Sequence, residues 1–396
     1  MPARTRTGLR HPHHRLGHVH APSPFARFGA LLATDLRDVT SDPSALESAG
    51  WWAVVADFEG RLLCARFGDV RRTPAPGAPR GAATAASRWH GPAPGAWTSS
   101  ADRAAYTAGV RRIREHIAAG EVYQANLCRV LSAPLPDPSP ETSDIAGLSA
   151  LLASGNPAPY AGAVRLPAHG VEVATASPEL FLRRGGSTVT SGPIKGTART
   201  AEEMLEKDHA ENVMIVDLVR NDLGRVCAPG SVTVPGLCEV EQHPGLVHLV
   251  STVRGELAAG AGWPDLLRHT FPPGSVTGAP KLSALKIIAE LETAPRGPYC
   301  GGIGWVDADR GTGELAVGIR TFWIERAGPA GGATGPRTCG GAVLRFGTGA
   351  GITWGSDPEK EWAETELKAS GLLKVASDVR HPEVPGSTAT NGRGAL

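Results

Sequence analysis

The stretch MLEKDHAENVMIVDLVRNDLG (residues 204–224) decides how the fold is interpreted, because it predicts one long helix with an apolar side suited to burial. The predicted helix ends at Gly224, a residue common at helix ends. A second long helix, PEKEWAETELKASGLLKVA (358–376), is predicted to begin at Pro358, whose fixed backbone suits the first helical turn. Both helices carry acidic residues three positions apart, so the chemistry of the chain is sought first on these two elements.

Shorter helices and several strands are predicted before and between these two helices. One helix covers residues 102–119 with Ser99 or Ser100 as its cap, and another covers 281–292. Strands are predicted within residues 50–68, as two short strands joined around Glu59 and Gly60, and over 122–131, 179–184 and 316–325. Because many strands alternate with helices, the fold class is α/β or α+β.

The composition indicates a protein with a substantial hydrophobic core. Its net charge gives no reason to expect binding to a polyanion. Of 396 residues, 41% are hydrophobic and 20% are charged, and the formal net charge is +1. This balance does not favour nucleic acid or an anionic membrane as a partner, and no apolar run reaches the roughly 18 residues of a membrane span. Six single cysteines without a CxxC pair indicate reduced thiols, so we expect a cytoplasmic protein without a zinc site.

Four segments are expected along the chain. Residues 1–24 are basic and rich in Pro, His and Arg, which predicts a disordered arm. Residues 25–96 form a reduced N-terminal region that ends in a linker rich in Pro, Gly and Ala. The main domain is expected over residues 97–376, and the polar residues 377–396 are expected to be a disordered tail.

Two acidic pairs could hold a cation. Asp208 and Glu211 are three residues apart on one predicted helix, and Glu361 and Glu364 are three apart on the other, so each pair lies on one helical face. Carboxylates brought together from two helices repel one another unless a cation or protons lie between them, and oxygen-only ligands suit Mg²⁺. The alternative is an ordinary surface ion pair, such as Glu364 with Lys368 four residues later.

Three further residues have settings that chemistry could use. Lys195 in SGPIKGT (191–197) lies in a compact, otherwise uncharged segment, where burial or nearby cations could lower its pKa and make it a nucleophile. A solvated loop lysine is the commoner case. Glu179 is a lone carboxylate beside a strand and could be paired with an arginine. His248 lies in an apolar stretch that is typical of a core histidine bonded to backbone.

Taken in order, ten short blocks resemble the chorismate-utilising enzymes, a family that contains anthranilate, aminodeoxychorismate, isochorismate and salicylate synthases. The blocks are EVYQANL (121–127), ASPELF (176–181), GPIKGT (192–197), AENVMIVDLVRNDLGRV (210–226), HLVSTV (248–253), PGSVTGAPK (273–281), GGIGWVD (301–307), GIRTF (318–322), GTGAGI (347–352) and DPEKEWAETELK (357–368). The resemblance covers about residues 97–375. It implies a single large chorismate-binding catalytic domain, in which two antiparallel sheets enclose helices around a deep cleft.

The resemblance also implies a metal site and two catalytic side chains. Glu211 and Glu364 would be Mg²⁺ ligands, with Glu361 and Asp208 in or next to the coordination sphere. Glu179 would be the general acid and base beside the hydroxyl that leaves. His248 would lie next to the substrate ring.

A further set of residues would bind the substrate. Arg320 would clamp the enolpyruvyl carboxylate of chorismate through its planar guanidinium. The remaining contacts would come from backbone amides near Gly349 and Gly351 and from the side chains of Thr197, Thr277, Lys281 and Lys368 around the pocket. Trp305 stands where the resemblance implies a substrate-binding tyrosine, so one phenol hydrogen bond would be lost.

Two positions choose among the reactions of the family. Isochorismate and salicylate synthases resemble this chain but carry a water-activating lysine where Gln124 stands. Anthranilate synthases read PIAGT where this chain reads PIKGT, so Lys195 favours the aminodeoxychorismate synthase branch. In that branch the lysine is expected to attack carbon 2 of chorismate and expel the 4-hydroxyl, before ammonia arrives at carbon 4 and displaces the lysine. The product would be 4-amino-4-deoxychorismate, on the route to 4-aminobenzoate for folate or for a secondary metabolite.

The source of ammonia and the rival functions complete these expectations. The chain has no Gly-x-Cys-x-Gly elbow of a glutaminase, so ammonia is expected from a separate glutamine amidotransferase subunit or from free ammonium. Component I of anthranilate synthase is the nearest alternative, because it shares the fold, metal and substrate. A catalytically silent chorismate-binding protein is the alternative from another class. SALESAG (44–50) contains a Leu-Glu-Ser element like the one that binds tryptophan in relatives, although three residues specify little.

Overall fold

The computed structural model describes residues 23–74, 89–137, 139, 142–198, 200–204, 206–243, 246–326 and 341–377. The α-helices are α2 (Arg103–Ala118), α3 (Ile145–Gly155), α4 (Glu206–Gly224), α5 (Trp263–Thr270), α6 (Lys281–Leu291) and α7 (Pro358–Ala376). The strands are β1 (Phe25–Phe28), β2 (Leu31–Thr40), β3 (Trp51–Ala56), β4 (Leu62–Arg72), β5 (Thr98–Ser99), β6 (Gln124–Pro134), β7 (Tyr160–Leu166), β8 (Val171–Ser177), β9 (Leu180–Gly185), β10 (Thr188–Gly192), β11 (Ile194–Ala198), β12 (Thr233–His243), β13 (Leu246–Glu256), β14 (Gly278–Ala279), β15 (Gly302–Asp307), β16 (Thr312–Val317), β17 (Thr321–Arg326) and β18 (Ala342–Ile352). No helix in these ranges has both the length and the apolar composition needed to cross a membrane.

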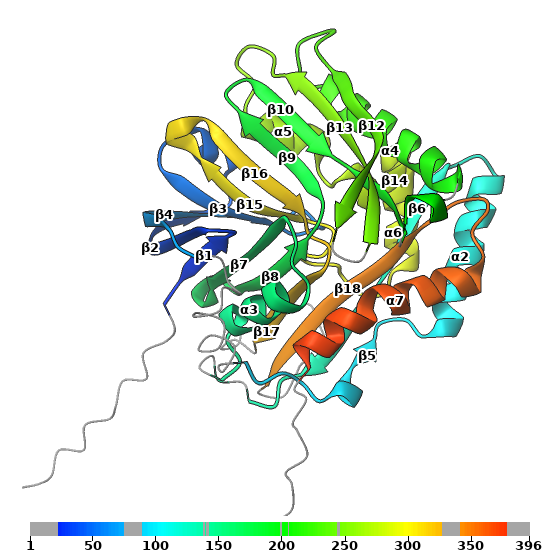
Figure 1. The fold of residues 1–396 in the computed structure, drawn as a ribbon, viewed down its shortest axis with the longest axis horizontal. Coiled ribbons are helices and arrows are strands. Elements are labelled where there is room, and N and C mark those ends of the chain that lie inside the picture. The colour runs from blue at the N-terminus through cyan, green and yellow to red at the C-terminus, as the bar shows by residue number, and fades with distance from the viewer. Residues whose placement is uncertain are drawn as a thin grey trace, which may run out of the picture.

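These strands form one antiparallel sheet of eighteen members. Starting from β12, the hydrogen-bonded neighbours follow in the order β13, β10, β9, β16, β15, β3, β4, β2, β1, β7, β8, β17, β18 and β6. β11 pairs with β13 at one end, and β5 and β14 pair with β6 at the other. The predicted mixture of helices with antiparallel strands is confirmed, and the two expected sheets are joined into one continuous ladder (Figure 1).

The N-terminal strands join the two halves of this ladder. β3 pairs with β15, and β1 pairs with β7, so residues 25–72 of the predicted N-terminal region belong to the same sheet as the main domain. The burial of Trp51 and Trp52 on β3 adds apolar area to the largest core cluster. Residues 1–22, 75–88 and 378–396, which include most of the predicted arm, linker and tail, lie outside the described residues.

The four predicted helices are present as α2, α4, α6 and α7, with a correction to the cap of α2. Asp102 caps this helix in place of the predicted Ser99 or Ser100, because its Oδ1 accepts a hydrogen bond from Ala105 N at 2.8 Å. A side-chain oxygen at this position satisfies a backbone N–H that the helix leaves without a partner.

One predicted strand is broken in the structure. The sequence predicts a single strand over residues 316–325, whereas β16 ends at Val317 and β17 begins at Thr321. Arg320 in the gap has a φ of 51°, in the left-handed region that side-chain-bearing residues seldom adopt. Alternation of apolar residues could not reveal this turn, because the turn is a property of the backbone at one position.

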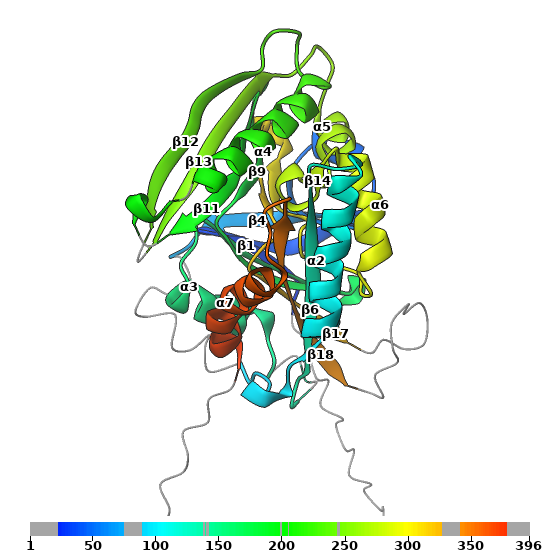
Figure 2. The same cartoon turned by 90° about the vertical axis from the view of Figure 1, so that its right-hand side faces the viewer.

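The helices α4 and α7 are bound to opposite ends of the ladder. Asn212 of α4 donates through Nδ2 to Leu249 O of β13 at 3.1 Å. Thr348 Oγ1 of β18 donates to Thr365 O of α7 at 3.0 Å, and Arg129 Nε of β6 donates to Thr365 Oγ1 at 3.1 Å. Figure 2 shows α4 against β13 and β12, and α7 beside α2. The two acidic helices are therefore fixed by different parts of one sheet.

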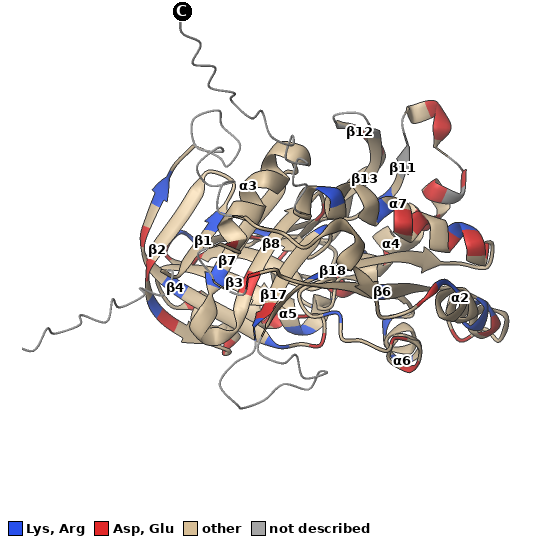
Figure 3. Ribbon diagram, turned by 90° about the horizontal axis from the view of Figure 1, so that it is seen from below, with Lys and Arg blue, Asp and Glu red and all other residues tan. Residues whose placement is uncertain are grey.

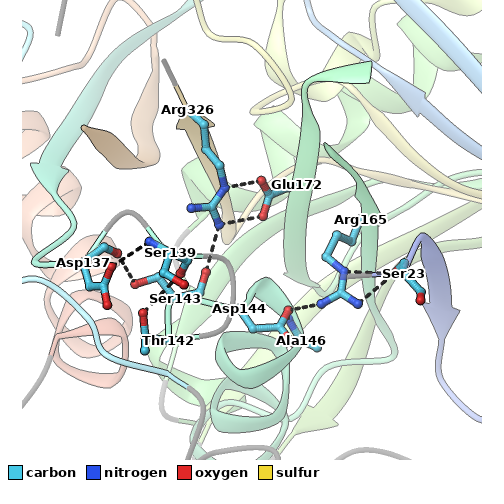
Figure 4. Close-up of polar contacts among 10 residues, drawn as sticks. All are labelled: Ser23, Asp137, Ser139, Thr142, Ser143, Asp144, Ala146, Arg165, Glu172 and Arg326. Atoms are coloured by element: carbon cyan, nitrogen blue, oxygen red, sulfur yellow. Dashed lines mark hydrogen bonds and ion pairs between the residues drawn. The ribbon is translucent and has the colours of Figure 1, made fainter. Parts of the chain in front are cut away.

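Two buried ion pairs hold α3 against neighbouring strands (Figure 4). Arg165 of β7 donates to Asp144 Oδ1 at 2.6 Å, and Asp144 also caps α3. Arg326 of β17 pairs with Glu172 of β8 through Nη2 and Oε2 at 2.9 Å, and it donates to Ser143 O at 3.0 Å. Since each guanidinium bridges two chain segments, these arginines fix the loop before α3 to the sheet.

A buried arginine connects segments that surround β6. Arg296 is 1% exposed and pairs with Glu292 through two hydrogen bonds, of 2.8 Å from Nε and 2.6 Å from Nη2. It also donates to Val276 O at 2.8 Å and to Asn126 O at 3.2 Å. Glu292 Oε1 in turn accepts from Cys128 N at 2.8 Å. Such a pair offsets the desolvation of its two charges only while both partners are present.

We predict that Arg296→Met lowers the free energy of unfolding by about 3 to 5 kcal/mol, because it leaves the Glu292 carboxylate buried without its counter-ion. Urea unfolding followed by circular dichroism measures the change. The matched control is Arg112→Met, which breaks an ion pair with Glu115 whose side chains are 48% and 65% exposed. The control should cost less than about 1 kcal/mol. Equal losses in the two variants would contradict a stabilising role for the buried pair.

Candidate active site

The two ends of the sheet meet at Gly351 of β18. A Cβ atom built on this glycine would lie 2.3 Å from Gln124 Nε2 and 3.2 Å from both Asn126 Oδ1 and Lys195 Nζ. Gln124 and Asn126 belong to β6, whereas Lys195 belongs to β11 at the other end of the ladder. Because glycine has no side chain, the amine of Lys195 can approach the backbone of β18. The structure thus places Lys195 Nζ beside Gly351.

Gly349 of β18 has a similar setting. A Cβ atom there would lie 2.5 Å from Cys128 Sγ, so this position also needs glycine. Its carbonyl oxygen accepts a hydrogen bond from Lys368 Nζ at 3.1 Å, and the same ammonium pairs with Glu364 Oε1 at 2.6 Å. Lys368 therefore connects α7 with the glycine-containing end of β18.

Lys195 lies among charges of both signs. Its pKa is lowered from the ordinary value of 10.5, chiefly because burial disfavours the charged ammonium. Glu211 opposes this shift most strongly, Glu179 and Glu364 oppose it as well, and the Lys368 ammonium adds to it. A lysine whose pKa is lowered offers more of the neutral amine, which is the form that acts as a nucleophile.

Glu179 is buried directly before β9, and its pKa is raised from 4.5 to about 7. Burial is the largest cause, and it is opposed by the Ser275 hydroxyl, by the Lys195 ammonium and by the backbone N–H of Ile194. The charged group that faces Glu179 is therefore a lysine and not the arginine of the sequence-based alternative. A carboxyl that titrates near neutrality can both donate and accept a proton, as a general acid and base must.

The predicted metal carboxylates come from two helices. Glu211 of α4 and Glu364 of α7 act on the pKa of the same lysine. Glu361 is buried one turn before Glu364, and Asp208 packs over Gly196, whose added Cβ would lie 2.9 Å from Asp208 Cβ. In Figure 3 the acidic segments of α4 and α7, drawn in red, lie on the same side of the molecule.

These carboxylates do not form a ready-made cage. Over the described ranges, no three His, Cys, Asp or Glu side chains are arranged so that they could hold a metal ion. The Glu364 carboxylate is paired with Lys368 in this structure. The donor set still fits Mg²⁺, which keeps several water ligands and takes only one or two protein carboxylates together with substrate oxygens. Glu211 and Glu364, which share Lys195 as a neighbour, are the two residues that suit this role.

Arg320 offers a cation without a counter-ion. No residue in the described part of the chain forms a hydrogen bond or ion pair with its guanidinium, and burial lowers its pKa. Its backbone lies in the left-handed region, and its carbonyl oxygen accepts a hydrogen bond from Ala176 N at 3.0 Å. Backbone strain of this kind is concentrated at functional sites. A half-buried guanidinium that has no counter-ion among the described residues suits an anionic ligand such as a carboxylate.

Three other predicted residues lie on neighbouring segments. His248 is buried on β13, opposite Thr197 of β11 in the register of the sheet. The side chain of Thr197 lies outside what the structure describes. Thr277 is buried, and its hydroxyl donates to Pro273 O at 3.2 Å and Gly274 O at 3.1 Å. The proposed contacts of these residues with a substrate stay predictions.

Lys281 and Trp305 are not joined to this group by any described contact. Lys281 Nζ pairs with Asp222 Oδ2 at 2.5 Å and donates to Thr270 O at 2.8 Å. The Trp305 indole stacks on Trp51, with ring centroids 6.2 Å apart and planes 10° from parallel. It lines a cavity of about 80 Å³ between β1, β7, β15 and β16. The resemblance alone placed both residues at the substrate, and this placement stays a prediction.

Asn126 is a site residue that sequence analysis missed. Gln124 and Asn126 are two residues apart on β6, so their side chains lie on the same face of the strand. Both are buried, and among the described residues no hydrogen-bond partner is present for the side-chain nitrogen and oxygen of Gln124 or for Asn126 Oδ1. Buried polar atoms without partners are rare, which favours a ligand at this place. In the sequence, only the spacing of the two amides in EVYQANL could have indicated that they lie on one face of a strand.

We predict that protein stability depends on pH through Glu179. Folding raises the pKa of this carboxyl from 4.5 to about 7, so its stabilising contribution is complete below pH 4.5 and is lost as the pH rises through 7. Glu179→Gln removes this dependence. The variant should therefore gain up to roughly 3 kcal/mol relative to the wild type between about pH 4.5 and pH 8. Urea unfolding at both pH values measures the gain, and a difference that does not change with pH would contradict the raised pKa.

Known proteins resemble this chain over most of its length. Residues 71–374 match the family model for chorismate binding enzymes. The chain is 40% identical over 320 residues to anthranilate synthase component 1 from Streptomyces coelicolor, and the match covers 77% of this chain and 57% of that relative. It is 41% identical over 280 residues to aminodeoxychorismate synthase from Streptomyces pristinaespiralis, with 67% of this chain and 35% of the relative covered.

The fold also matches solved structures. A Bacillus anthracis protein assigned as a 2,3-dihydroxybenzoate-specific isochorismate synthase superposes with a TM-score of 0.70 at 25% identity, over 89% of this chain and 95% of that one. The chain spans between half and two-thirds of the length of the first curated relatives that it matches. Because the family model covers residues 71–374, and relatives about 40% identical share this region, the chain belongs to the chorismate-binding enzyme family.

Proposed function

We propose that this chain is component I of an aminodeoxychorismate synthase, which converts chorismate and ammonia to 4-amino-4-deoxychorismate. The observation that carries the proposal is the position of Lys195 Nζ, beside the backbone of Gly351 and within electrostatic reach of Glu211 and Glu364. The resemblance gives anthranilate synthases an alanine here, which offers no nucleophile. Burying an amine among these groups carries a desolvation cost, and a catalytic role would account for it.

The proposed first step uses three side chains. The neutral amine of Lys195 attacks carbon 2 of chorismate, the ring double bond shifts, and the bond between carbon 4 and its hydroxyl breaks. Glu179, in its protonated form, gives a proton to the departing hydroxyl, which leaves as water. The lysine nitrogen gives one proton to water in the site as its new bond forms. Arg320 holds the enolpyruvyl carboxylate through its guanidinium, so the ring cannot turn during the attack.

The second step regenerates the lysine. Ammonia attacks carbon 4, the double bond shifts back, and the bond between carbon 2 and the lysine nitrogen breaks. The incoming nitrogen gives up one proton and the lysine nitrogen takes one up, so Lys195 returns as a neutral amine. Gln124 has no basic amine with which to activate water, which favours ammonia as the nucleophile of this step.

Mg²⁺ is the proposed cofactor, with Glu211 and Glu364 as its protein ligands and Glu361 and Asp208 in supporting positions. When bound, it would supply positive charge for the ring carboxylate of chorismate and for the charge that develops as the hydroxyl leaves. The same two carboxylates raise the pKa of Lys195 in the structure. If these carboxylates bind Mg²⁺, they would raise the pKa of Lys195 less. The pKa would then be lower still, which favours the neutral amine that the attack requires.

The proposed partner is a separate glutamine amidotransferase subunit in the cytoplasm, which would deliver ammonia. The second candidate function is component I of anthranilate synthase. It is supported by the Streptomyces coelicolor relative, whose match covers more of this chain than the aminodeoxychorismate synthase match does. The two functions differ in the carbon that receives ammonia, so the product distinguishes them.

We predict that Lys195→Ala lowers the formation of 4-amino-4-deoxychorismate from chorismate, Mg²⁺ and ammonium by roughly a thousandfold or more, because the covalent step is lost. Product is measured by chromatography with mass detection. Lys286→Ala, which changes an exposed lysine of α6, is the matched control and should retain wild-type activity. Ammonium should not rescue Lys195→Ala, since ammonia enters only after the lysine has bonded to the ring.

A trapping experiment gives an independent outcome for the same residue. Intact-mass measurement of the wild type with chorismate and without ammonia should show an adduct that Lys195→Ala lacks. Anthranilate as the product of the wild type would establish the second candidate function. Binding of chorismate with no product from the wild type would instead indicate a silent binding protein.

We predict that Glu211→Gln and Glu364→Gln each lower turnover by about a hundredfold or more, because each removes a carboxylate that Mg²⁺ requires. Calorimetric titration with Mg²⁺ should show weaker binding in both variants, which separates loss of the metal from other damage. Glu359→Gln changes an exposed carboxylate on the same helix, α7, and serves as the control. Wild-type turnover that is insensitive to EDTA would contradict the magnesium assignment.

A further inference from the structure

A small cavity of about 20 Å³ lies next to Glu179, between β9, β10, the C-terminal half of α4 and the segment that follows α5. Its polar lining consists of the side chains of Glu179, Ser191, Asp222, Thr270 and Ser275, all of them buried. The described residues that line the cavity do not include those assigned to the substrate. This polar cavity is therefore a compartment behind the proposed general acid, separate from the substrate contacts.

Two carboxyl groups with different partners line this cavity. Glu179 interacts with the Ser275 hydroxyl and with Lys195. Asp222 lies near the C-terminal end of α4 and is bound by Lys281. Burial raises the pKa of Asp222, while Lys281 and then the exposed Arg225 oppose that shift. The side chain of Lys281 is 13% exposed, so the ion pair that binds Asp222 borders the protein surface.

We propose that Asp222 and Ser275 form a proton relay that recharges Glu179 from solvent through water in this cavity. The relay rests on the proposed function, in which Glu179 gives its proton to the departing hydroxyl. A volume of about 20 Å³ has room for one water molecule, which needs two to four polar partners, and this lining provides them. Carboxyl and hydroxyl groups can both accept and donate a proton, so each lining group can pass one on.

Each proton transfer in the relay is balanced. After Glu179 has lost its proton, its carboxylate accepts one from the Ser275 hydroxyl or from an adjacent water. That oxygen takes a proton from the carboxylic acid form of Asp222, either directly or through the one water molecule that the cavity can hold. Solvent at the Lys281 end then restores the proton of Asp222. Only O–H bonds break and form, and the charge is balanced by the proton that the Lys195 nitrogen loses on the substrate side.

The alternative is that Asp222 and Lys281 form only a structural ion pair, which fixes α4 to α6. Such a pair requires neither a polar cavity nor a hydroxyl that contacts Glu179. The two interpretations differ in what Asp222→Asn does: a relay residue changes proton delivery, whereas a structural residue changes stability alone.

The test compares Asp222→Asn, Asp222→Glu and Asp144→Asn in the full-length protein. Asp222→Asn should lower kcat by about 10- to 100-fold, at the lower end of what general acid catalysis contributes, with little change in the KM for chorismate. It should increase the solvent deuterium isotope effect, and imidazole buffer should restore turnover in proportion to its concentration. Asp222→Glu should retain most of the activity, because it keeps a carboxyl group at the cavity.

Asp144→Asn is the matched control. It breaks the pair with Arg165, whose side chains are 11% and 8% exposed, against 13% and 9% for Lys281 and Asp222. It should lose stability but keep the wild-type kcat and isotope effect. Ser275→Ala provides a second variant if Asp222→Asn does not fold, and it should show the same fall in kcat and the same response to imidazole.

Two results would overturn the relay. One is a folded Asp222→Asn or Ser275→Ala with the kcat and isotope effect of the wild type. The other is a loss of activity that neither imidazole nor Asp222→Glu restores, which would assign Asp222 to structure. Wild-type activity is measured first: a wild type without product refutes the proposed function and the relay together. An active wild type with equally active variants refutes the relay alone.

Discussion

The site depends on one steric constraint, which is the absence of side chains at Gly349 and Gly351 of β18. The space beside these glycines is taken by Cys128 Sγ, by Gln124 Nε2 and by the amine of Lys195. β18 pairs with β6 along its whole length, so a side chain at either glycine would push β6 or the lysine away. The side chain of Lys195 on β11 reaches Gly351 on β18, so groups from opposite ends of the open sheet lie together there.

Burial shifts the pKa values of two groups in the candidate site. It lowers the pKa of Lys195 and raises that of Glu179, since a low-dielectric setting favours the neutral form of an amine and of a carboxyl alike. A neutral nucleophile and a protonated acid are the two states that the proposed first step requires. Glu211 and Glu364 oppose the lowering of the Lys195 pKa. A cation bound by these carboxylates would therefore also change the pKa of Lys195.

Sequence periodicity and the family resemblance could predict the long helices, the mixed class and the group around Lys195. They could not predict features that depend on a single backbone position or on distant contacts. The break at Arg320 is a left-handed turn within an apolar stretch, and the stack of Trp305 on Trp51 joins strands far apart in sequence. Asn126 was missed because an amide becomes informative only when its lack of partners is known.

Overall sequence identity and the residue at position 195 give different information about the reaction of this chain. Identity of about 40% to both an anthranilate synthase and an aminodeoxychorismate synthase does not separate the two reactions. In the proposed function the choice between them rests on one atom, Lys195 Nζ, which would hold carbon 2 while ammonia attacks carbon 4. Such an atom adds almost nothing to an identity score. The lowered pKa of Lys195, its carboxylate neighbours and its approach to Gly351 are therefore the grounds of the proposal, whereas the relatives show the family.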